Sequence, residues 1–274
     1  MTTTGGHAVL ADVDASQRAA FEESYSVADE RWAFHYTSDP LTRYLRDRRL
    51  TLALDALSRA VPDGTTIESV LVVCGGVGGE GTFFRKRGFG DVTVSDFSSE
   101  ALQRCNRLDP GLKTRLLDAE RMDVPDASYD LVVVQDGLHH LPRPALGFAE
   151  MLRVARVAVI LIEPHHGLVG KIAGREWEIQ GDAVNYVFRW NTAMLEQCTR
   201  SYLLSRDARV IGMRVWDHGL AVANAVAHLP SALRLPAAKA IYAALTPVSR
   251  VGNMMVGVVV KGGDTAAPPR LTSH

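Results

Sequence analysis

The hydrophobic pattern of the first part of the chain is helical. Apolar side chains recur near helical spacing between Gln17 and Val61, and the turn sequence that begins at Pro62 ends this pattern. The small and polar residues in front of it show no such periodicity. We therefore expect a flexible N-terminus over residues 1–16, followed by a helical cap over residues 17–62.

Strand-like and helix-like patterns alternate in the next part of the chain. The expected strands are short, apolar and mostly β-branched: Glu68–Cys74, Val92–Ser95, Thr114–Leu117, Leu131–Val134 and Val157–Ile162. The expected helices between them are Thr82–Gly88, Ser98–Leu108 and Pro144–Val154. Such strands, separated by helical crossovers, are typical of a doubly wound α/β sheet that is covered on both faces.

The pattern becomes less regular after the last of these strands. A segment over residues 164–191 that contains several Gly, Trp and Tyr residues comes first. The elements expected after it are a helix at Thr192–Tyr202, a strand at Ala208–Trp216 and a last strand at Met254–Val260. These elements extend the sheet, so we expect one domain core over residues 63–262.

An apolar helical stretch separates the last two expected strands. It covers Leu220–Leu245 and is interrupted at Pro230 and Pro236. Because it also carries charged side chains, we interpret it as a helical insertion over residues 219–252 and not as a membrane span. The polar residues 263–274 are expected to form a flexible tail.

The composition is that of an ordinary globular protein. Hydrophobic residues make up 47% of the chain and charged residues 22%, which argues against disorder, collagen-like repeats and coiled coils. Thirty basic and 31 acidic residues give a formal net charge of −1. No overall positive field attracts a phosphate backbone, so we expect no nucleic-acid partner.

The cysteines and the apolar runs restrict the cellular setting. Cys74, Cys105 and Cys198 lie far apart in the sequence, so they form neither a disulfide framework nor a zinc ligand cluster, and no metal is expected. The longest apolar runs fall short of the roughly 18 residues that a bilayer span requires. These features predict a cytoplasmic protein without membrane contact.

A glycine cluster follows the first expected strand directly. Gly76, Gly78 and Gly81 have the G-x-G-x-x-G spacing, and Asp96 follows Gly76 by 20 positions. Such a loop lets the backbone turn tightly, approach a ligand and present helix N–H groups to it. One interpretation is a dinucleotide site in which the acidic residue binds a ribose hydroxyl, as in an NAD(P)-dependent oxidoreductase.

The glycine loop and the stretches after it resemble class I S-adenosylmethionine-dependent methyltransferases. The loop resembles motif I of that family, and Asp118 and Ala119 follow the third strand where the family has its adenine contact. Residues 122–130 resemble the family's approach to strand four, and Leu-His-His-Leu at 138–141 resembles the turn after it. The resemblance covers about residues 68–164. It implies a Rossmann-like, mostly parallel seven-stranded sheet with an antiparallel last strand.

The resemblance also implies the cofactor and the residues that hold it. The cofactor would be S-adenosylmethionine, with S-adenosylhomocysteine as its product. Asp96 would hold the ribose, Phe97 would face the adenine, and Asp118 with Ala119 would meet the adenine edge. The other residues assigned to this site are glycines of the loop, residues after strand four and lid residues of the helical cap: Gly75, Gly76, Gly78, Gln135, Asp136, Trp32 and Tyr36.

Two positions depart from the pattern of the family. Val72 stands where an acidic residue is usual, and Cys74 stands where the first glycine is common. Glu80 would either replace the missing acidic group or stabilise the N-terminus of the following helix. These departures leave a second alternative, a non-catalytic, methyltransferase-like partner protein.

Methyl transfer requires an acceptor atom held close to the sulfonium carbon in a site that excludes water, and only some acceptors need a base. His165 and His166 after the fifth strand and His140 after the fourth are the candidate catalytic residues, since a reference pKa of about 6.5 suits proton transfer. The candidate substrate contacts are aromatic or polar residues of the segment at 164–191 and of the sixth strand's end: Trp177, Glu178, Asn185, Tyr186, Trp190 and His218.

Together these observations predict an S-adenosylmethionine-dependent methyltransferase that acts on a small molecule, such as a secondary metabolite. Methylation at carbon, nitrogen or oxygen is left open. The helical insertion would build one wall of an apolar acceptor pocket or a dimer contact. We expect a monomer or a homodimer.

Overall fold

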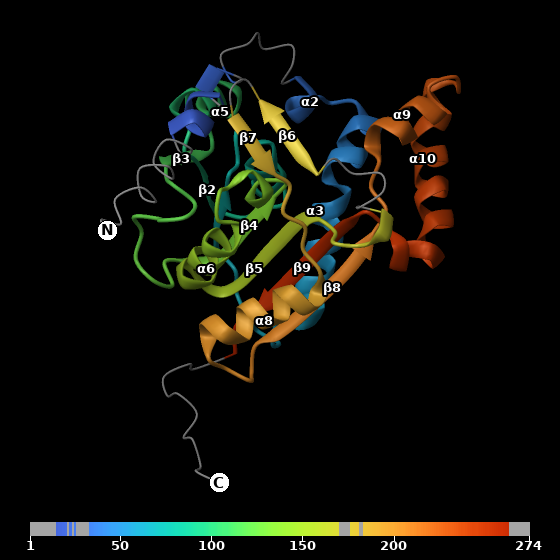
Figure 1. Cartoon of the computed structure of the whole chain (residues 1–274). Coiled ribbons are helices and arrows are strands. Elements are labelled where there is room, and N and C mark those ends of the chain that lie inside the picture. The colour runs from blue at the N-terminus through green and yellow to red at the C-terminus, as the bar shows by residue number, and fades with distance from the viewer. Residues whose placement is uncertain are drawn as a thin grey trace.

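A seven-stranded sheet runs through the centre of the protein, in the order β3-β2-β1-β4-β5-β9-β8 (Figure 1). The computed structural model describes residues 15–20, 22–23, 25, 33–169, 176–180 and 183–262. The strands of this sheet are β1 (Ser69–Val73), β2 (Asp91–Asp96), β3 (Lys113–Leu116), β4 (Tyr129–Gln135), β5 (Ala155–Pro164), β8 (Arg209–Val215) and β9 (Met254–Val260).

The direction of the strands confirms the fold predicted from the sequence. Neighbouring strands from β3 through β5 pair in parallel, and β9 pairs antiparallel with both β5 and β8. The sheet is therefore mostly parallel, with an antiparallel last strand. Its order reverses between β1 and β4, which creates a switch point at the carboxyl ends of these two strands, where open α/β sheets bind ligands.

Helices cover both faces of the sheet. One buried cluster joins the first face to α3 (Pro40–Ala60), α4 (Gly79–Lys86) and α5 (Ser99–Leu108). The other cluster joins the second face to α6 (Pro144–Val154) and α8 (Thr192–Leu203). The strands can be apolar on both sides because neither face of the central sheet meets solvent, and β4 shows this with five consecutive buried residues.

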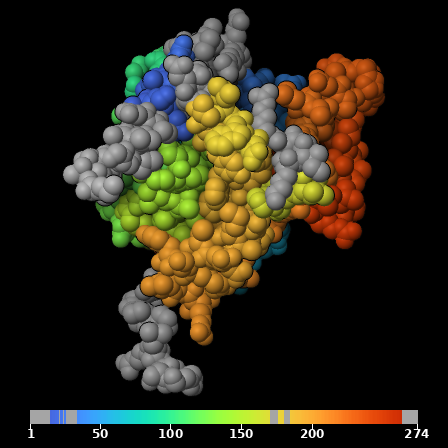
Figure 2. All heavy atoms as spheres, viewed as in Figure 1, coloured from blue at the N-terminus to red at the C-terminus, as the bar shows by residue number. Residues whose placement is uncertain are grey.

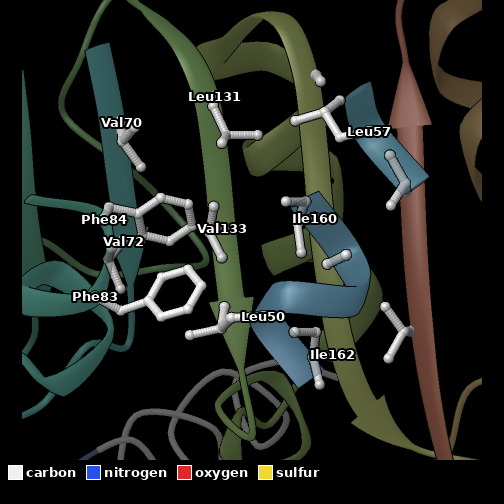
Figure 3. Packing of buried hydrophobic residues seen from close by; sticks show 14 of the residues in the cluster. Leu50, Leu57, Val70, Val72, Phe83, Phe84, Leu131, Val133, Ile160 and Ile162 are labelled. Carbon is white, nitrogen blue, oxygen red and sulfur yellow. The ribbon is translucent and has the colours of Figure 1, made fainter. Parts of the chain in front are cut away.

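The helix α3 is a layer of the core and not only a cap. Asp39 starts it as N-cap, with its carboxylate accepting a hydrogen bond from the Thr42 amide at 2.7 Å. Leu50 and Leu57 are 1% and 2% exposed and belong to the same buried cluster as Ile160 of β5 (Figure 3). The boundary that the sequence suggests near residue 62 therefore does not divide the packing, and the sheet's first face is complete only with α3.

Two other features of the fold differ from the sequence expectations. The segment at 164–191 contains a hairpin of β6 (Trp177–Gln180) and β7 (Ala183–Tyr186), which was not predicted. The insertion forms α9 (Gly219–Val226) and α10 (Ser231–Leu245), and α10 continues through Pro236. The interruption expected at Pro236 is wrong because Ala238 and Tyr242 beyond it are buried against α3 and α9 and hold the helix together.

Shorter helices include α2 (Ala33–Tyr36), η2 (Leu138–His140) and η3 (Thr246–Val251). The helices α9 and α10 pack against each other and on α3, at the right of the view in Figure 1. None of the helices in the described ranges combines the length and the apolar character that a membrane crossing requires.

Leu57→Ala is expected to lower the free energy of unfolding by about 2–5 kcal/mol, because it opens a cavity beneath the sheet. Leu116→Ala is the control, since Leu116 is 58% exposed on the edge strand β3 and should change stability by less than about 0.5 kcal/mol. Urea unfolding monitored by circular dichroism measures both. Equal, small effects for the two variants would show that α3 is a detachable cap.

Candidate active site

Two cavities meet at the switch point of the sheet. The smaller, of about 140 Å³, is lined by residues that follow β2, β3 and β4. The larger, of about 640 Å³, lies between the glycine loop, α2, α3 and α9. Tyr25, Cys74 and Asp136 line both cavities. The two spaces are therefore adjoining parts of one site at the carboxyl ends of β1 and β4.

The glycine loop owes its shape to three residues with positive φ: Cys74 at 52°, Gly76 at 50° and Gly78 at 90°. The Gly75 amide donates to the Ser95 carbonyl at 2.8 Å, which ties the loop to β2. Cys74 thus adopts the left-handed conformation itself, and the departure from glycine at this position leaves the loop intact. Burial raises the pKa of its thiol well above the usual range, so Cys74 is a neutral wall of the site.

The acidic residue that the family usually carries near the end of β1 is not replaced by another acidic residue on that strand. Val72 is completely buried in the core beneath the sheet. Glu80, in the first turn of α4, brings a carboxyl into the larger cavity instead, where it accepts a hydrogen bond from Gln135 Nε2 at 3.1 Å. Burial and the nearby charge of Asp136 raise its pKa to about 7, against the opposing effect of Arg49. Because Glu80 lies in the first turn of α4, its carboxyl can also stabilise the N-terminus of this helix, as considered from the sequence.

An ion-pair cluster, in which Arg49 and Asp217 are largely buried, lines the larger cavity. Arg49 of α3 lies 2.7 Å from Asp217 through Nε, and its terminal nitrogens donate to both carboxylate oxygens of Asp136. Tyr242 of α10 donates to Asp217 at 3.2 Å. Arg49 and Asp217 were not identified from the sequence, because the contacts join three segments that are far apart in the chain.

Asp96 ends β2 at the smaller cavity and is 4% exposed. Its Oδ2 accepts from the Gly76 amide at 2.9 Å and its Oδ1 from the Ser98 amide at 2.9 Å. Burial raises its pKa to about 6, so the carboxylate is ionised at neutral pH. A carboxylate has about four acceptor positions, which leaves capacity for a ribose hydroxyl.

Residues 15–20, 22–23 and 25, here called the N-terminal strap, close the smaller cavity. Glu22 caps α5, accepting from Ser98 Oγ at 2.8 Å and from the Ser99 amide at 2.9 Å. The Arg18 guanidinium lies 5.2 Å from the centre of the Phe97 ring. The Tyr25 hydroxyl lies so close to Gly76 that a Cβ at this glycine would be 2.7 Å from it. Tyr25 and Arg18 therefore cover the site, although the sequence singled out other residues as its lid.

Most of the residues assigned to the cofactor line the two cavities: Gly75, Gly76, Asp96, Phe97, Asp118, Ala119, Gln135 and Asp136. Gly78 and Tyr36 support the loop, and the Tyr36 hydroxyl donates to the Val77 carbonyl. Trp32 lies outside the described residues.

The three candidate histidines occupy different surroundings. His140 lines the smaller cavity, and its Nδ1 lies 3.2 Å from Glu178. His165 and His166 line neither cavity. Burial and the neighbouring Arg214 lower the pKa of His165 to about 4, so this imidazole is neutral at physiological pH.

The expected substrate contacts are also divided. Trp177, Glu178, Asn185 and Tyr186 lie on the β6–β7 hairpin, which is exposed at the face shown in Figure 2 and lines neither cavity. His218 precedes α9 and lies outside the cavity linings as well.

The assignment of Trp190 to the substrate is wrong. This side chain is completely buried, and its ring packs 5.3 Å from Phe148 and 5.2 Å from Phe188 in the second core cluster. The outer walls of the larger cavity come from apolar residues of α2, α3 and α9 that the sequence did not single out: Phe34, Leu45, Leu220 and Ala223.

The sequence of residues 71–162 matches the family model of a methyltransferase domain. This stretch of the chain is a methyltransferase domain by its sequence. This match, together with the strand order, confirms the predicted class I fold and the enzyme class. No curated protein matches the chain.

Solved structures share the fold of this methyltransferase at low sequence identity. The methyltransferase bound to the Haloferax volcanii Trm112 activator has a TM-score of 0.56 and 18% identity over 86% of this chain and 96% of its own. The plantazolicin methyltransferase BpumL was solved in complex with a monoazolic desmethylPZN analog and S-adenosylhomocysteine. It has a TM-score of 0.53 and 14% identity over 93% of this chain and 98% of its own. The [4+2]-cyclase SpnF has a TM-score of 0.51 and 16% identity over 77% of this chain and 81% of its own.

Gly78→Ala is expected to destabilise the methyltransferase more than Gly88→Ala. Both glycines have φ of 90°, so both variants carry the left-handed cost of about 1–2 kcal/mol. A Cβ at Gly78 would also lie 2.4 Å from Cys105 Sγ, whereas nothing lies within 4 Å at Gly88. This overpacking should lower the free energy of unfolding, as measured with urea, by a further 1–3 kcal/mol, roughly. Equal losses would mean that the loop does not pack tightly on α5.

Proposed function

We propose that the protein transfers the methyl group of S-adenosylmethionine to a small molecule that is enclosed in the larger cavity. The observation that carries this proposal is the meeting of the two cavities at Cys74 and Asp136, beside the glycine loop. One cavity is suited to the nucleoside end of the cofactor and the other to an acceptor. The reacting atoms would then lie at the junction, beneath Tyr25 of the strap.

The residues of the smaller cavity fit an adenosine group. Asp96 would accept hydrogen bonds from the ribose, Phe97 would lie against the adenine face, and Asp118 with Ala119 would meet its edge. All four line this cavity. Gly76 lies directly against Tyr25, and even a methyl group at this position would collide with the Tyr25 hydroxyl.

The larger cavity has the size and lining of a small-molecule site. Its volume of about 640 Å³ lies within the range of about 300–1,000 Å³ that is usual for such sites. Phe34, Leu45 and Leu220 give it apolar walls, and Glu80 with Gln135 gives it a polar end beside the glycine loop. We infer a largely apolar acceptor with one polar group, such as a secondary metabolite. The fold that the chain shares with BpumL, a plantazolicin methyltransferase, is consistent with this inference.

When bound, S-adenosylmethionine would supply an electrophilic methyl group to the lone pair of the acceptor, and the C–S electron pair would return to sulfur. An amine or hydroxyl acceptor also loses a proton. Glu80 is the group placed to remove it, because its carboxyl lines the acceptor cavity and its pKa of about 7 matches neutral conditions. The proton then passes from Glu80 to water as the product leaves. We propose Glu80, and not His165 or His166, as the general base.

Calorimetric titration with S-adenosylhomocysteine is expected to show one binding site. Asp96→Asn should weaken this binding about 10–100-fold, because a hydrogen bond to a charged group contributes about 1.5–3 kcal/mol. Asp63→Asn, in an exposed turn, is the control and should bind like the parent protein. If NADH and not S-adenosylhomocysteine binds, the protein is an oxidoreductase. If neither binds, it is a non-catalytic member of the fold.

Glu80→Gln is expected to lower turnover about 10²–10⁴-fold and to remove the pH dependence near 7. In the parent protein, turnover should rise as the pH increases through about 7, because only the ionised Glu80 accepts a proton. Release of S-adenosylhomocysteine from a panel of small amines and phenols measures the rate, and Glu68→Gln, at an exposed position, is the control. Unchanged turnover with weaker cofactor binding would instead assign Glu80 to the methionine end of the cofactor.

A further inference from the structure

A group of metal-ligating side chains lies beside the smaller cavity. Among the described residues, His139, His140 and Glu178 form a group whose ligand atoms all lie within 4.8 Å of one another. His140 Nδ1 and Glu178 Oε2 are 3.2 Å apart. Donor atoms around a tetrahedral zinc ion, at metal distances of about 2.0–2.2 Å, are separated by about 3.3–3.5 Å. The His140–Glu178 pair therefore already has the spacing that such an ion requires, and the ligand atom of His139 lies within 4.8 Å of both.

A second carboxylate orients His139 in the way that metal sites use. Glu163 is completely buried, and its Oε2 lies 2.7 Å from His139 Nδ1. With Nδ1 directed at this carboxylate, the opposite ring nitrogen, Nε2, is the one that His139 offers to an ion. Metal-binding histidines commonly have a carboxylate partner of this kind, which fixes the ring and increases its basicity.

The backbone around the group is also held in place. Glu163 Oε1 accepts hydrogen bonds from the amides of Gly137 at 2.9 Å and Leu138 at 2.7 Å, which fixes the start of η2. Asn185 Nδ2 of the hairpin donates to the His139 carbonyl. The two histidines and the hairpin that carries Glu178 are thus already joined without an ion.

We propose that the protein binds a divalent cation of the zinc type through His139, His140 and Glu178, and that this ion fastens the β6–β7 hairpin to η2. Two imidazoles and one carboxylate form a donor set typical of zinc sites that keep one position open. Because His140 also lines the smaller cavity, the ion would connect the hairpin to the wall of the cofactor site. The proposal concerns a binding site and does not depend on the identity of the acceptor.

The test is calorimetric titration of the chelator-treated, full-length protein with Zn²⁺. One ion is expected per chain, with a simultaneous change in the fluorescence of Trp177, which is 56% exposed and adjacent to Glu178. Glu178→Gln should weaken binding by about tenfold or more. Glu163→Gln, which replaces the carboxylate that faces His139 and the Gly137 and Leu138 amides, should weaken it by about 10–100-fold.

Glu176→Gln is the matched control, because Glu176 is exposed two positions before Glu178. It should bind Zn²⁺ like the parent protein. Because Glu178 is on a surface hairpin, its substitution tests the site even if the buried Glu163 variant fails to fold. The proposal is overturned if the parent protein binds no Zn²⁺, or if Glu178→Gln and Glu176→Gln bind it equally well. The binding of S-adenosylhomocysteine is scored separately, so a failure here leaves the methyltransferase proposal standing.

Discussion

The geometry of the site depends on one buried arginine. Arg49 extends from α3 toward the carboxyl edge of the sheet, where it meets Asp136 after β4 and Asp217 after β8. A guanidinium has five donors in one plane and can bind two carboxylates at once. The loop after β4, the helix α3 and the start of the insertion are therefore held at one point.

The same cluster determines the charge state of the site. One guanidinium faces two carboxylates, so its positive charge is already balanced before Glu80 is considered. A further ionised carboxyl is unfavourable there, which is why burial and Asp136 raise the pKa of Glu80 to about 7. Loss of Arg49 would leave both carboxylates without their shared cation, whereas loss of one carboxylate would leave Arg49 paired with the other. The contact that fixes the geometry thus also sets the acid strength of the neighbouring group.

Local patterns were sufficient to predict the sheet, because strands buried on both faces are short apolar runs with glycine, proline or polar residues at their ends. The residues that follow those strands could also be assigned, since the carboxyl ends of parallel strands share one edge. Long-range packing could not be predicted. The apolar residues of α3 have the same spacing whether they cover a sheet or a cleft. The sequence around Trp190 likewise does not distinguish a core residue from a residue that lines a pocket. The walls of the larger cavity come from separate helices, and only folding brings Phe34 near Leu220.

Two strained backbone positions lie where the two cavities meet. Cys74 after β1 and Asp136 after β4 are both non-glycine residues with positive φ, at 52° and 53°. Such conformations cost about 1–3 kcal/mol each and persist only where the surroundings enforce them. Gly137 helps to make room, because a Cβ there would lie 2.5 Å from the Cys74 Cβ, and Arg49 holds the Asp136 carboxylate. Both strained residues line both cavities, so the fold maintains an unfavourable backbone at the place where cofactor and acceptor would have to meet.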